Sequence, residues 1–378
     1  MAGTIAVSGG LAQRPGRGGH AWVFVTWLLA LRELGWSVVF VDRLEEAWID
    51  HPVPGSVEAG WLAEVMRRFD LERDWALLYE QGDRSLGLTR EELRERLDDS
   101  ATLINVMGYL DDPELRDRPR HRIYLDIDPG WPQMWTKLGL YEGLAQHDDY
   151  VTVGRNLGAA GCKVPECGID WNPIWPPVLL DQWEPTAEVE DFSFTSVATW
   201  RGPNSSLEYE GGRYGLRAHS FRQLAVLPES TGETFLLALD LGPEDEEDLR
   251  LLLDHGWDLE DPLKVAGDPD SYRDFIRGSG AELSVAKELY ALTGSGWFSD
   301  RSSAYLAAGK PVLALDTGVP PGPDGGLLVY SSLAEAEQGV AEIGRDRPGH
   351  AAAARAFAEE HLDARRVVGS LLERLEVG

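Results

Sequence analysis

Residues 292–318 read LTGSGWFSDRSSAYLAAGKPVLALDTG. Their apolar pattern predicts a short helix over Ser302–Ala308 and a strand over Pro311–Leu315, with a loop of glycine and serine before the helix. A loop that enters a helix gathers backbone N–H groups at the positive end of the helix dipole, which is a favourable place for phosphate. The stretch therefore predicts an α/β unit with an anion-binding loop.

The sequence on both sides of this stretch continues the same alternation. Strands are predicted at 194–198 and 235–239, and helices at 244–253 and 283–292. Helical spacing over 350–375 predicts one or two helices at the end of the chain. Alternating strands and helices are typical of a parallel sheet with helices on its faces.

The first half of the chain follows the same plan. Thr4–Ser8 predicts a buried strand, 21–34 a helix and 37–41 the next strand, and together they predict a βαβ unit. Further strands are predicted at 102–106, 122–127 and 150–153. Each half therefore has the elements of its own parallel sheet.

A change of composition separates the two halves. The stretch 171–183 (WNPIWPPVLLDQW) is rich in proline and tryptophan, and 184–191 is acidic. Both lack helical or strand periodicity, which marks a domain boundary. We therefore expect an α/β protein of two facing Rossmann-like domains, 1–183 and 192–350, with helices at 351–378 that return to the first domain.

The quoted stretch resembles the donor-binding segment of GT-B glycosyltransferases, in which a loop leads into a helix and then into G-x-P-V, here Gly309-Lys310-Pro311-Val312. The tandem α/β layout extends the resemblance over nearly the whole chain. It implies a UDP-, dTDP- or GDP-sugar as donor and no other cofactor. The two glutamates of the retaining family 4 are absent, because Gly296 and Ala304 stand at their positions.

Several loops at the expected carboxyl ends of the strands supply candidate donor-binding residues. Gly296 would let backbone approach the ligand, serine hydroxyls would donate hydrogen bonds, and Arg301 would grip phosphate with two nitrogens. The alternatives are an N-capped surface helix, a core tryptophan at Trp297 and a surface ion pair at Arg201. The full set is Trp200, Arg201, Gly202, Lys287, Gly296, Trp297, Ser299, Asp300, Arg301, Ser302, Ser303, Asp316, Thr317 and Gly318.

The loop after the first strand permits a second interpretation. Residues 16–21 (GRGGHA) match G-x-G-x-x-A, and Asp42 lies at the distance typical of a ribose contact in an NAD site. Residues 9–15 come between the strand and these glycines, which argues against an NAD-dependent oxidoreductase. An epimerase of nucleotide sugars and a non-catalytic nucleotide binder are further alternatives. In the glycosyltransferase interpretation, Gly18 and Gly19 are candidates for ligand contact.

Three residues are candidates for catalysis. The resemblance to inverting GT-B enzymes implies that His20, at the start of the first helix, is the general base that deprotonates the acceptor hydroxyl. Asp126 and Asp128 follow the apolar run Ile123–Leu125 at the end of the predicted strand, and one of them would orient His20. The alternatives are a packing histidine and an Asp turn. A D-x-D at a strand end is also the metal signature of GT-A enzymes, but we expect no metal because the predicted diphosphate site lies in the other domain.

Charge and composition limit the classes of molecule that the chain is expected to bind. The formal net charge of -29 argues against nucleic acid and against anionic lipid, since both attract Lys and Arg. The most apolar early stretch, 21–40, is interrupted by Arg32 and Glu33, so we expect no membrane span. Cys162 and Cys167 alone make a poor zinc site. We therefore expect a cytoplasmic glycosyltransferase with a small-molecule acceptor, in natural-product or glycoconjugate biosynthesis.

Overall fold

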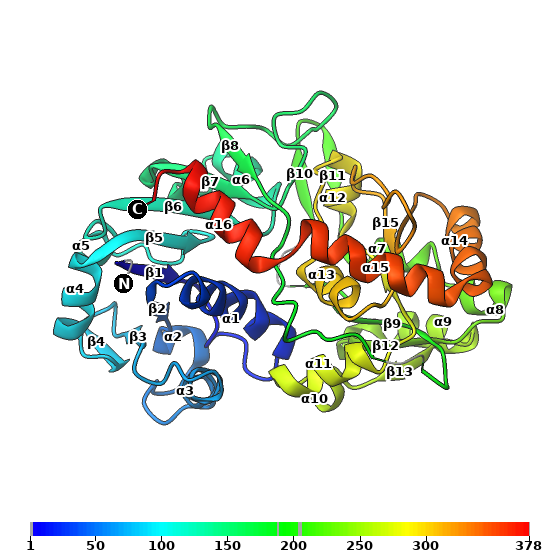
Figure 1. Ribbon diagram of the computed structural model, residues 1–378, viewed down its shortest axis with the longest axis horizontal. Coiled ribbons are helices and arrows are strands. Elements are labelled where there is room, and N and C mark those ends of the chain that lie inside the picture. Colours follow the sequence, from blue (N-terminus) through cyan, green and yellow to red (C-terminus); the bar gives the residue numbers. More distant parts are fainter. Residues whose placement is uncertain (1–2, 187–188, 203–205, 378) are drawn as a thin grey trace. The chain divides into compact units, whose positions relative to one another are not determined.

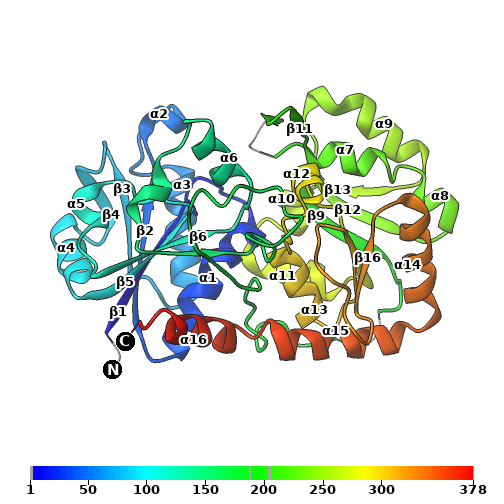
Figure 2. The ribbon, with the colours of Figure 1, turned by 90° about the horizontal axis from the view of Figure 1, so that it is seen from above.

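The computed structural model describes residues 3–186, 189–202 and 206–377. Contacts divide the chain into two units. Unit 1 holds the described residues up to Val153, Glu166–Pro177 and the described residues from Ala364, and unit 2 holds Gly154–Pro165 and Val178–Asp363. Each unit contains its own largely parallel sheet with helices on its faces (Figures 1 and 2), which confirms the predicted pair of Rossmann-like folds.

The contacts show at which residues the chain passes from one unit to the other. Residues 154–165 pack in unit 2, and so do residues 178–183, which precede the boundary expected from composition. The predicted boundaries, 1–183, 192–350 and 351–378, stay a prediction about which segments fold on their own.

The sheet of unit 1 has the strand order β4-β3-β2-β1-β5-β6-β7-β8. All neighbouring strands are parallel except β3 and β4. The chain moves outward from β1 to β2 on one side and from β5 to β6 on the other, so the strand order reverses between β1 and β5. The strands are β1 (Thr4–Ser8), β2 (Ser37–Arg43), β3 (Trp75–Tyr79), β4 (Arg84–Gly87), β5 (Ser100–Val106), β6 (His121–Asp126), β7 (Asp149–Thr152) and β8 (Trp171–Pro173).

Helix α1 (Gly18–Glu33) is apolar on most sides, and eleven of its 16 residues are buried. The last helix, α16 (Ala364–Arg374), lies beside it (Figures 1 and 2), where Arg365 Nε is 2.5 Å from Glu33 Oε2. The predicted return of the C-terminal helix to the first domain is therefore confirmed for α16, whereas the helix before it, up to His361, belongs to unit 2. The other helices of unit 1 are α2 (Glu46–Ile49), α3 (Val57–Arg68), α4 (Arg90–Asp98), α5 (Pro113–Arg116) and α6 (Trp131–Lys137). In the described part of the chain, no helix is long and apolar enough to cross a membrane.

The main sheet of unit 2 has the order β13-β12-β9-β14-β15-β16, with every neighbouring pair parallel. Its strand order reverses between β9 and β14. Stacked rings fill the core, such as Phe194 on Phe235 and Trp200 on Phe221. The strands are β9 (Phe194–Thr199), β12 (Phe235–Asp240), β13 (Asp258–Glu260), β14 (Ala281–Ser284), β15 (Val312–Leu315) and β16 (Leu327–Tyr330), and a separate hairpin is formed by β10 (Leu207–Tyr209) and β11 (Gly212–Tyr214).

The helices of unit 2 include the one predicted from the quoted stretch. That helix is α13 (Asp300–Ala307), and strand β15 follows it as expected. One prediction was wrong: 283–292 is not a single helix, because strand β14 ends at Ser284 before α12 begins at Glu288. The helices are α7 (Arg217–Arg222), α8 (Leu227–Thr231), α9 (Glu246–Asp254), α10 (Pro262–Val265), α11 (Pro269–Arg277), α12 (Glu288–Thr293), α13, α14 (Leu333–Arg345) and α15 (Arg347–His361).

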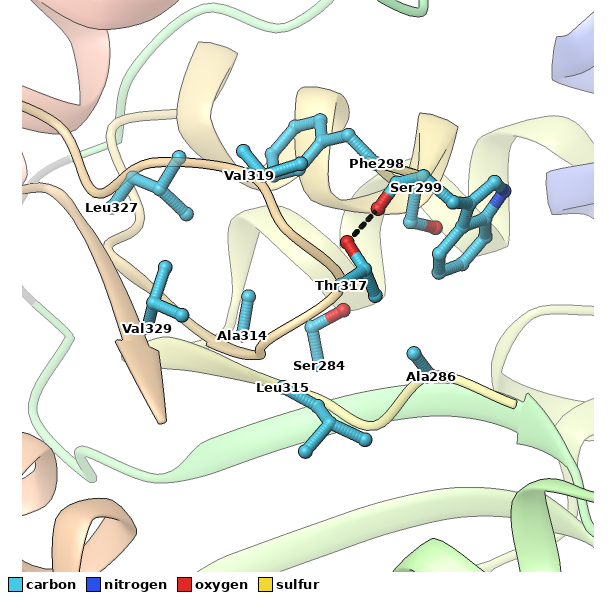
Figure 3. A pocket seen from close by; sticks show the side chains of 11 residues that line it. Ser284, Ala286, Phe298, Ser299, Ala314, Leu315, Thr317, Val319, Leu327 and Val329 are labelled. Carbon is cyan, nitrogen blue, oxygen red and sulfur yellow. Dashed lines mark hydrogen bonds between the residues drawn. The ribbon is translucent and has the colours of Figure 1, made fainter. Parts of the chain in front are cut away.

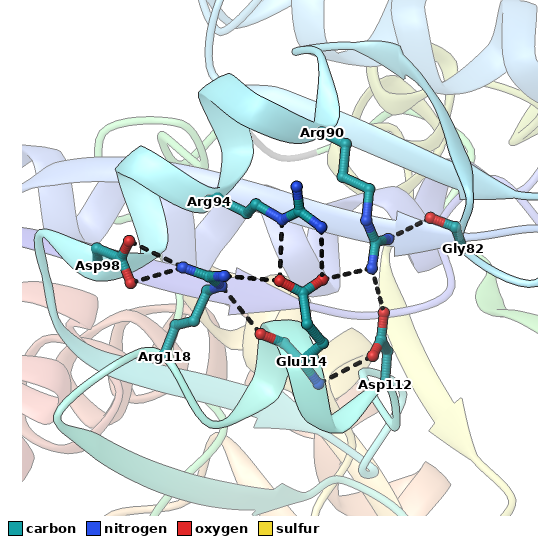
Figure 4. A network of polar contacts seen from close by, with 7 residues as sticks. All are labelled: Gly82, Arg90, Arg94, Asp98, Asp112, Glu114 and Arg118. Carbon is teal, nitrogen blue, oxygen red and sulfur yellow. Dashed lines mark hydrogen bonds and ion pairs between the residues drawn. The ribbon is translucent and has the colours of Figure 1, made fainter.

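An ion-pair network joins α4 and α5 at the surface of unit 1 (Figure 4). Glu114 accepts hydrogen bonds from Arg90 Nη2 at 2.5 Å, Arg94 Nε at 2.9 Å and Arg118 Nη2 at 2.6 Å. These guanidinium groups, Arg94 first, lower the pKa of Glu114 to about 2. Arg118 also pairs with Asp98. Arg90 also donates to the carbonyl of Gly82, so the network ties the turn after β3 to the segment after β5 and stabilises the surface of unit 1.

Glu114→Gln is expected to lower the free energy of unfolding at pH 7 by less than about 1 kcal/mol, because the pairs are partly exposed. The folded pKa lies below the unfolded value of about 4.3, so this contribution is present above pH ~4.3 and is lost as the pH falls towards 2. Urea unfolding between pH 2.5 and 8 measures it, with the exposed Glu95→Gln as control. A difference that does not shrink in acid would contradict this assignment.

Candidate functional site

The strand-order reversal of unit 2 brings two loops together at the carboxyl edge of its sheet. Ligands of doubly wound sheets bind at this position. Arg217, the first residue of α7, connects the two loops and is only 9% exposed. Its Nε donates to Val285 O, after β14, at 2.9 Å, and its Nη1 donates to Thr199 O, at the end of β9, at 3.1 Å. This arginine therefore places a positive charge at the carboxyl edge of the sheet, where β9 and β14 end, and no sequence motif predicted it.

Lys287 lies in the loop after β14, two residues beyond Val285. Its Nζ is 5.4 Å from the centroid of the Tyr290 ring, and Tyr290 stacks on Trp297 with the centroids 4.3 Å apart and the planes at 15°. Cation–π contact and stacking fix the direction of the lysine stem. Lys287 and Trp297, both predicted, thus belong to one cluster with Tyr290, which sequence reasoning missed.

A small pocket lies beside this cluster, lined by side chains of β15 and β16, by the end of β14 and by the loops at 297–299 and 317–319 (Figure 3). Its walls are mostly apolar. Thr317 Oγ1 donates to Trp297 O at 2.6 Å, which ties the loop after β15 to the loop before α13. The lining residues are Ser284, Ala286, Trp297, Phe298, Ser299, Ala314, Leu315, Thr317, Val319, Leu327 and Val329.

Arg301 is not placed to grip a phosphate. Its side chain is buried, and its Nε is 2.5 Å from Oε1 of Glu282, which is itself 0% exposed. Its Nη1 donates to Val197 O at 2.9 Å and its Nη2 to Ser284 Oγ at 3.2 Å. The guanidinium therefore neutralises a buried carboxylate and links two strands, which corrects its predicted role.

The serines of α13 also face inward. Ser299 Oγ caps the helix by accepting from Arg301 N at 3.2 Å. Ser302 Oγ is 3.1 Å from Ser284 Oγ, and Ser303 Oγ donates to Ser299 O at 3.4 Å. Both are 0% exposed, while Asp300 is exposed in the first turn. The cap at Ser299 agrees with the alternative of an N-capped helix, but α13 is not a surface helix, because all its residues after Asp300 are buried. Its serine hydroxyls bond within the protein and do not form the predicted phosphate cradle.

Two of the predicted glycines, Gly296 and Gly318, leave space for Asn156 and not for a ligand. Gly296 has φ +69°, and a Cβ there would lie 2.8 Å from Asn156 N. Gly318 has φ +95°, and Asn156 Nδ2 donates to its carbonyl at 3.0 Å and to Gly294 O at 3.2 Å. Asn156 thus organises both loops, and it was missed because it lies about 140 residues earlier in the chain. Asp316 Oδ1 accepts from Gly318 N at 2.7 Å and closes the turn between them.

In the loop after β9, the predicted donor-binding residues Trp200 and Arg201 contact side chains of the protein. Trp200 is fully buried, and its Nε1 donates to Asp248 Oδ2 at 2.7 Å, so it is a core residue. Arg201 pairs with Asp245 at 2.5 Å, which is the surface ion pair that we considered as the alternative. Gly202 has φ +80° and ends the part of this loop that the structure describes.

In unit 1, the loop between β1 and α1 is held by Asp42. Asp42 Oδ2 accepts from Ala12 N and its Oδ1 from Arg43 N, both at 2.6 Å, and burial raises its pKa to about 7. The carboxylate therefore serves the loop and not a ribose. Gly18 and Gly19 form the first turn of α1 and not a tight turn after the strand, so the NAD fingerprint is not formed.

His20 is half-buried near the start of α1. Its Nε2 lies 3.0 Å from Gly10 O, so Nε2 carries the proton and Nδ1 keeps a lone pair. The ring packs edge-on against Phe24, with the centroids 5.1 Å apart. Burial lowers the pKa of His20 to about 4, the Gly10 carbonyl opposes this shift, and the charge of Arg14 adds to it. At neutral pH the imidazole is therefore uncharged and able to accept a proton at Nδ1.

Neither of the two candidate carboxylates, Asp126 and Asp128, bonds to His20. Buried Asp126 accepts from Gln133 Nε2 at 2.7 Å, Thr152 Oγ1 at 2.9 Å and Asp128 N at 3.0 Å, and burial raises its pKa to about 7. It therefore holds the turn that contains Asp128. Within the described residues, His20 has the Gly10 carbonyl as its one hydrogen-bond partner, and no group of three His, Cys, Asp or Glu is placed to hold a metal.

Comparison with known proteins finds solved structures that are similar to this chain. No family model and no curated protein matches the sequence. HepE from Anabaena, solved with UDP, has a TM-score of 0.57 at 13% identity over 100% of both chains, and its complex with UDP-glucose has 0.61 over 99% of both. An alpha-glucosyltransferase in complex with UDP and DNA has 0.63 at 10% identity, over 100% of this chain and 99% of that one.

The chain has the GT-B fold. This confirms the architecture that the quoted stretch and the tandem α/β pattern predicted. On the GT-B fold, the predicted donor-binding residues divide into two groups. Lys287, Trp297 and Thr317 cluster at the carboxyl edge of unit 2, whereas Trp200, Arg301, Ser302 and Ser303 have their side chains inside the unit.

Proposed function

We propose that this GT-B chain is a glycosyltransferase that transfers a sugar from a nucleoside diphosphate to a hydroxyl group. The observation that carries the proposal is the pair of cations, Arg217 and Lys287, at the strand-order reversal of unit 2. A leaving diphosphate gains negative charge as its bond to the sugar breaks, and fixed cations stabilise that charge. Trp297, which stacks on Tyr290 beside Lys287, is the candidate aromatic contact for the nucleoside.

UDP is the first nucleotide to test. HepE has been solved with UDP and with UDP-glucose, and the alpha-glucosyltransferase with UDP. The dTDP and GDP sugars remain candidates for this chain. Since the alpha-glucosyltransferase was solved with DNA, DNA is a competing acceptor, but the net charge of -29 favours a small molecule.

The chemistry assigned to unit 1 is general base catalysis by His20. The acceptor hydroxyl would lose its proton to His20 Nδ1 while its oxygen bonds to the anomeric carbon of the donor sugar. The bond from that carbon to the phosphate oxygen breaks, and the nucleoside diphosphate leaves with the electron pair. Because the pKa of His20 is about 4, it is a weak base, so proton transfer should accompany bond formation and not precede it.

Activity is expected to be independent of divalent metal. In this proposal, Arg217 and Lys287 do the work that Mg²⁺ or Mn²⁺ does in D-x-D enzymes. Dialysis against EDTA, followed by turnover assays with UDP-glucose, should leave the rate within about twofold of its starting value. A loss that Mn²⁺ restores and that Asp128→Asn reproduces would overturn this prediction and favour the metal role of the D-x-D sequence.

The direct test of the proposed function is a screen of nucleotide sugars for transfer and hydrolysis. Release of UDP, dTDP or GDP from at least one donor is expected. Arg217→Ala should reduce the release, while Arg250→Ala, which removes an exposed arginine of the same unit, should not. Binding of a diphosphate without any turnover would favour the non-catalytic nucleotide binder.

A further inference from the structure

Three polar side chains surround Gly10 at the carboxyl edge of unit 1, where the strand order reverses between β1 and β5. His20 Nε2 donates to the Gly10 carbonyl at 3.0 Å. A Cβ at Gly10 would lie 2.9 Å from the Tyr109 ring and 3.1 Å from Gln13 Cδ, so both side chains cover this residue. Tyr109 comes from the loop after β5 and Gln13 from the loop after β1, and they meet at Gly10, whose carbonyl accepts from the proposed base.

Arg14 follows Gln13 in the loop after β1 and has an unusual environment for this chain. The chain has 64 acidic and 35 basic residues, and most of its arginines at the surface of unit 1 are paired with carboxylates. Arg14 is exposed, and within the described residues its guanidinium has neither an ion pair nor a hydrogen bond. Its charge acts on both His20 and Tyr109.

Tyr109 is a second donor without a protein partner. Its side chain is 38% exposed, and its hydroxyl makes no hydrogen bond to any described residue. Burial raises its pKa, so the hydroxyl keeps its proton at neutral pH. A cation in the loop after β1 and a hydroxyl donor that packs over Gly10 of the same loop suit a negatively charged group. A cation there also makes His20 a weaker base, which is a cost unless the charge has a ligand to bind.

We propose that the acceptor is a hydroxy acid whose carboxylate is bound by Arg14 and Tyr109, beside the hydroxyl that His20 deprotonates. The inference rests on the proposed function and adds the class of acceptor. A single guanidinium offsets a single negative charge, which favours a carboxylate over a phosphate dianion in a chain of net charge -29. Asp128, whose charge also acts on Tyr109, adds repulsion against a second negative charge.

The test is a library of hydroxyl-bearing acceptors in matched sets of acid, amide and phosphate ester, such as 4-hydroxybenzoate, 4-hydroxybenzamide and 4-hydroxyphenyl phosphate. The full chain is assayed with its active nucleotide sugar. At least one acid should be used at least tenfold better than its amide, in kcat/KM. Arg14→Ala should abolish that preference by lowering kcat/KM for the acid about 10–100-fold, as expected for one charged hydrogen-bonded contact. Tyr109→Phe should raise KM for the acid more than it lowers kcat.

Arg73→Ala is the matched control, because Arg73 is another exposed arginine of unit 1, and it should change nothing. UDP binding, measured on the same samples, separates this inference from the proposed function. If Arg14→Ala weakens UDP binding, Arg14 serves the donor and the inference is wrong. It is also wrong if no acid is used, if the amides or phosphate esters are preferred, or if Arg14→Ala affects acid and amide equally.

Discussion

His20→Ala is expected to lower kcat by about 10²–10⁴-fold and to leave UDP binding unchanged, because the substitution removes the proposed proton acceptor and no contact to the donor. Since the pKa of His20 is about 4, protonation of His20 should not limit kcat/KM between pH 5 and 8, and the rate should fall in acid as the imidazole becomes charged. Steady-state rates of the purified variant, compared with the surface variant His51→Ala, measure the effect.

Circular dichroism and UDP titration show whether the His20 variant is folded. Near-normal turnover in a folded His20→Ala protein would remove His20 from the mechanism and leave it as a residue that packs on Phe24. The configuration of the product is a separate observation. A product that keeps the anomeric configuration of the donor would reject inversion, whatever the His20 variant does.

Arg217→Ala is expected to raise the Kd of UDP by about 10–100-fold, the effect of one charged hydrogen-bonded contact. Arg217 also holds the carbonyls of Thr199 and Val285, so a general disturbance of the loops must be distinguished from the loss of a charge. Arg217→Lys keeps the charge and should recover part of the affinity. Uridine, which has no phosphate, should bind the wild type and both variants equally. An equal loss of uridine and UDP affinity would assign Arg217 a structural role only.

The architecture could be predicted from the sequence because the strands are short, apolar and regularly spaced. Thr4–Ser8 was predicted with its observed bounds, and Phe194–Thr199 lies within one residue of its prediction. The error at 283–292 has a physical cause. Strand β14 has four buried residues and is followed three residues later by a helix, so the run AELSVAKELYALT has no break that separates the two periods.

The candidate site was harder to predict because several motif residues serve the protein and not a ligand. Arg301 was chosen as a cation near a helix start, but its partner Glu282 lies on a buried strand that the sequence did not reveal. Gly296 was assigned to ligand approach, whereas Asn156 occupies that space. Arg217 had no motif around it, and its position at the crevice follows only from the order of the strands.

In unit 1, the position of His20 was predicted correctly, but its hydrogen-bond partner was predicted incorrectly. His20 does lie at the carboxyl edge of the sheet, beside the loop after β1. Of its two candidate carboxylate partners, Asp126 binds Gln133 and Thr152, contacts that depend on the fold and not on spacing in the chain, and neither carboxylate bonds to His20. Tyr109 was missed because a lone tyrosine in a loop has no pattern that marks it.

The central claim is that unit 2 binds a nucleoside diphosphate through its cations, and calorimetric titration of UDP and uridine into the full chain tests it most directly. We expect one UDP per chain and an affinity for UDP about 100-fold or more above that for uridine, since two cations contact the diphosphate. The same comparison with dTDP and GDP against their nucleosides covers the other donors. Equal binding of diphosphate and nucleoside, or no binding of any of the three diphosphates, would contradict the account.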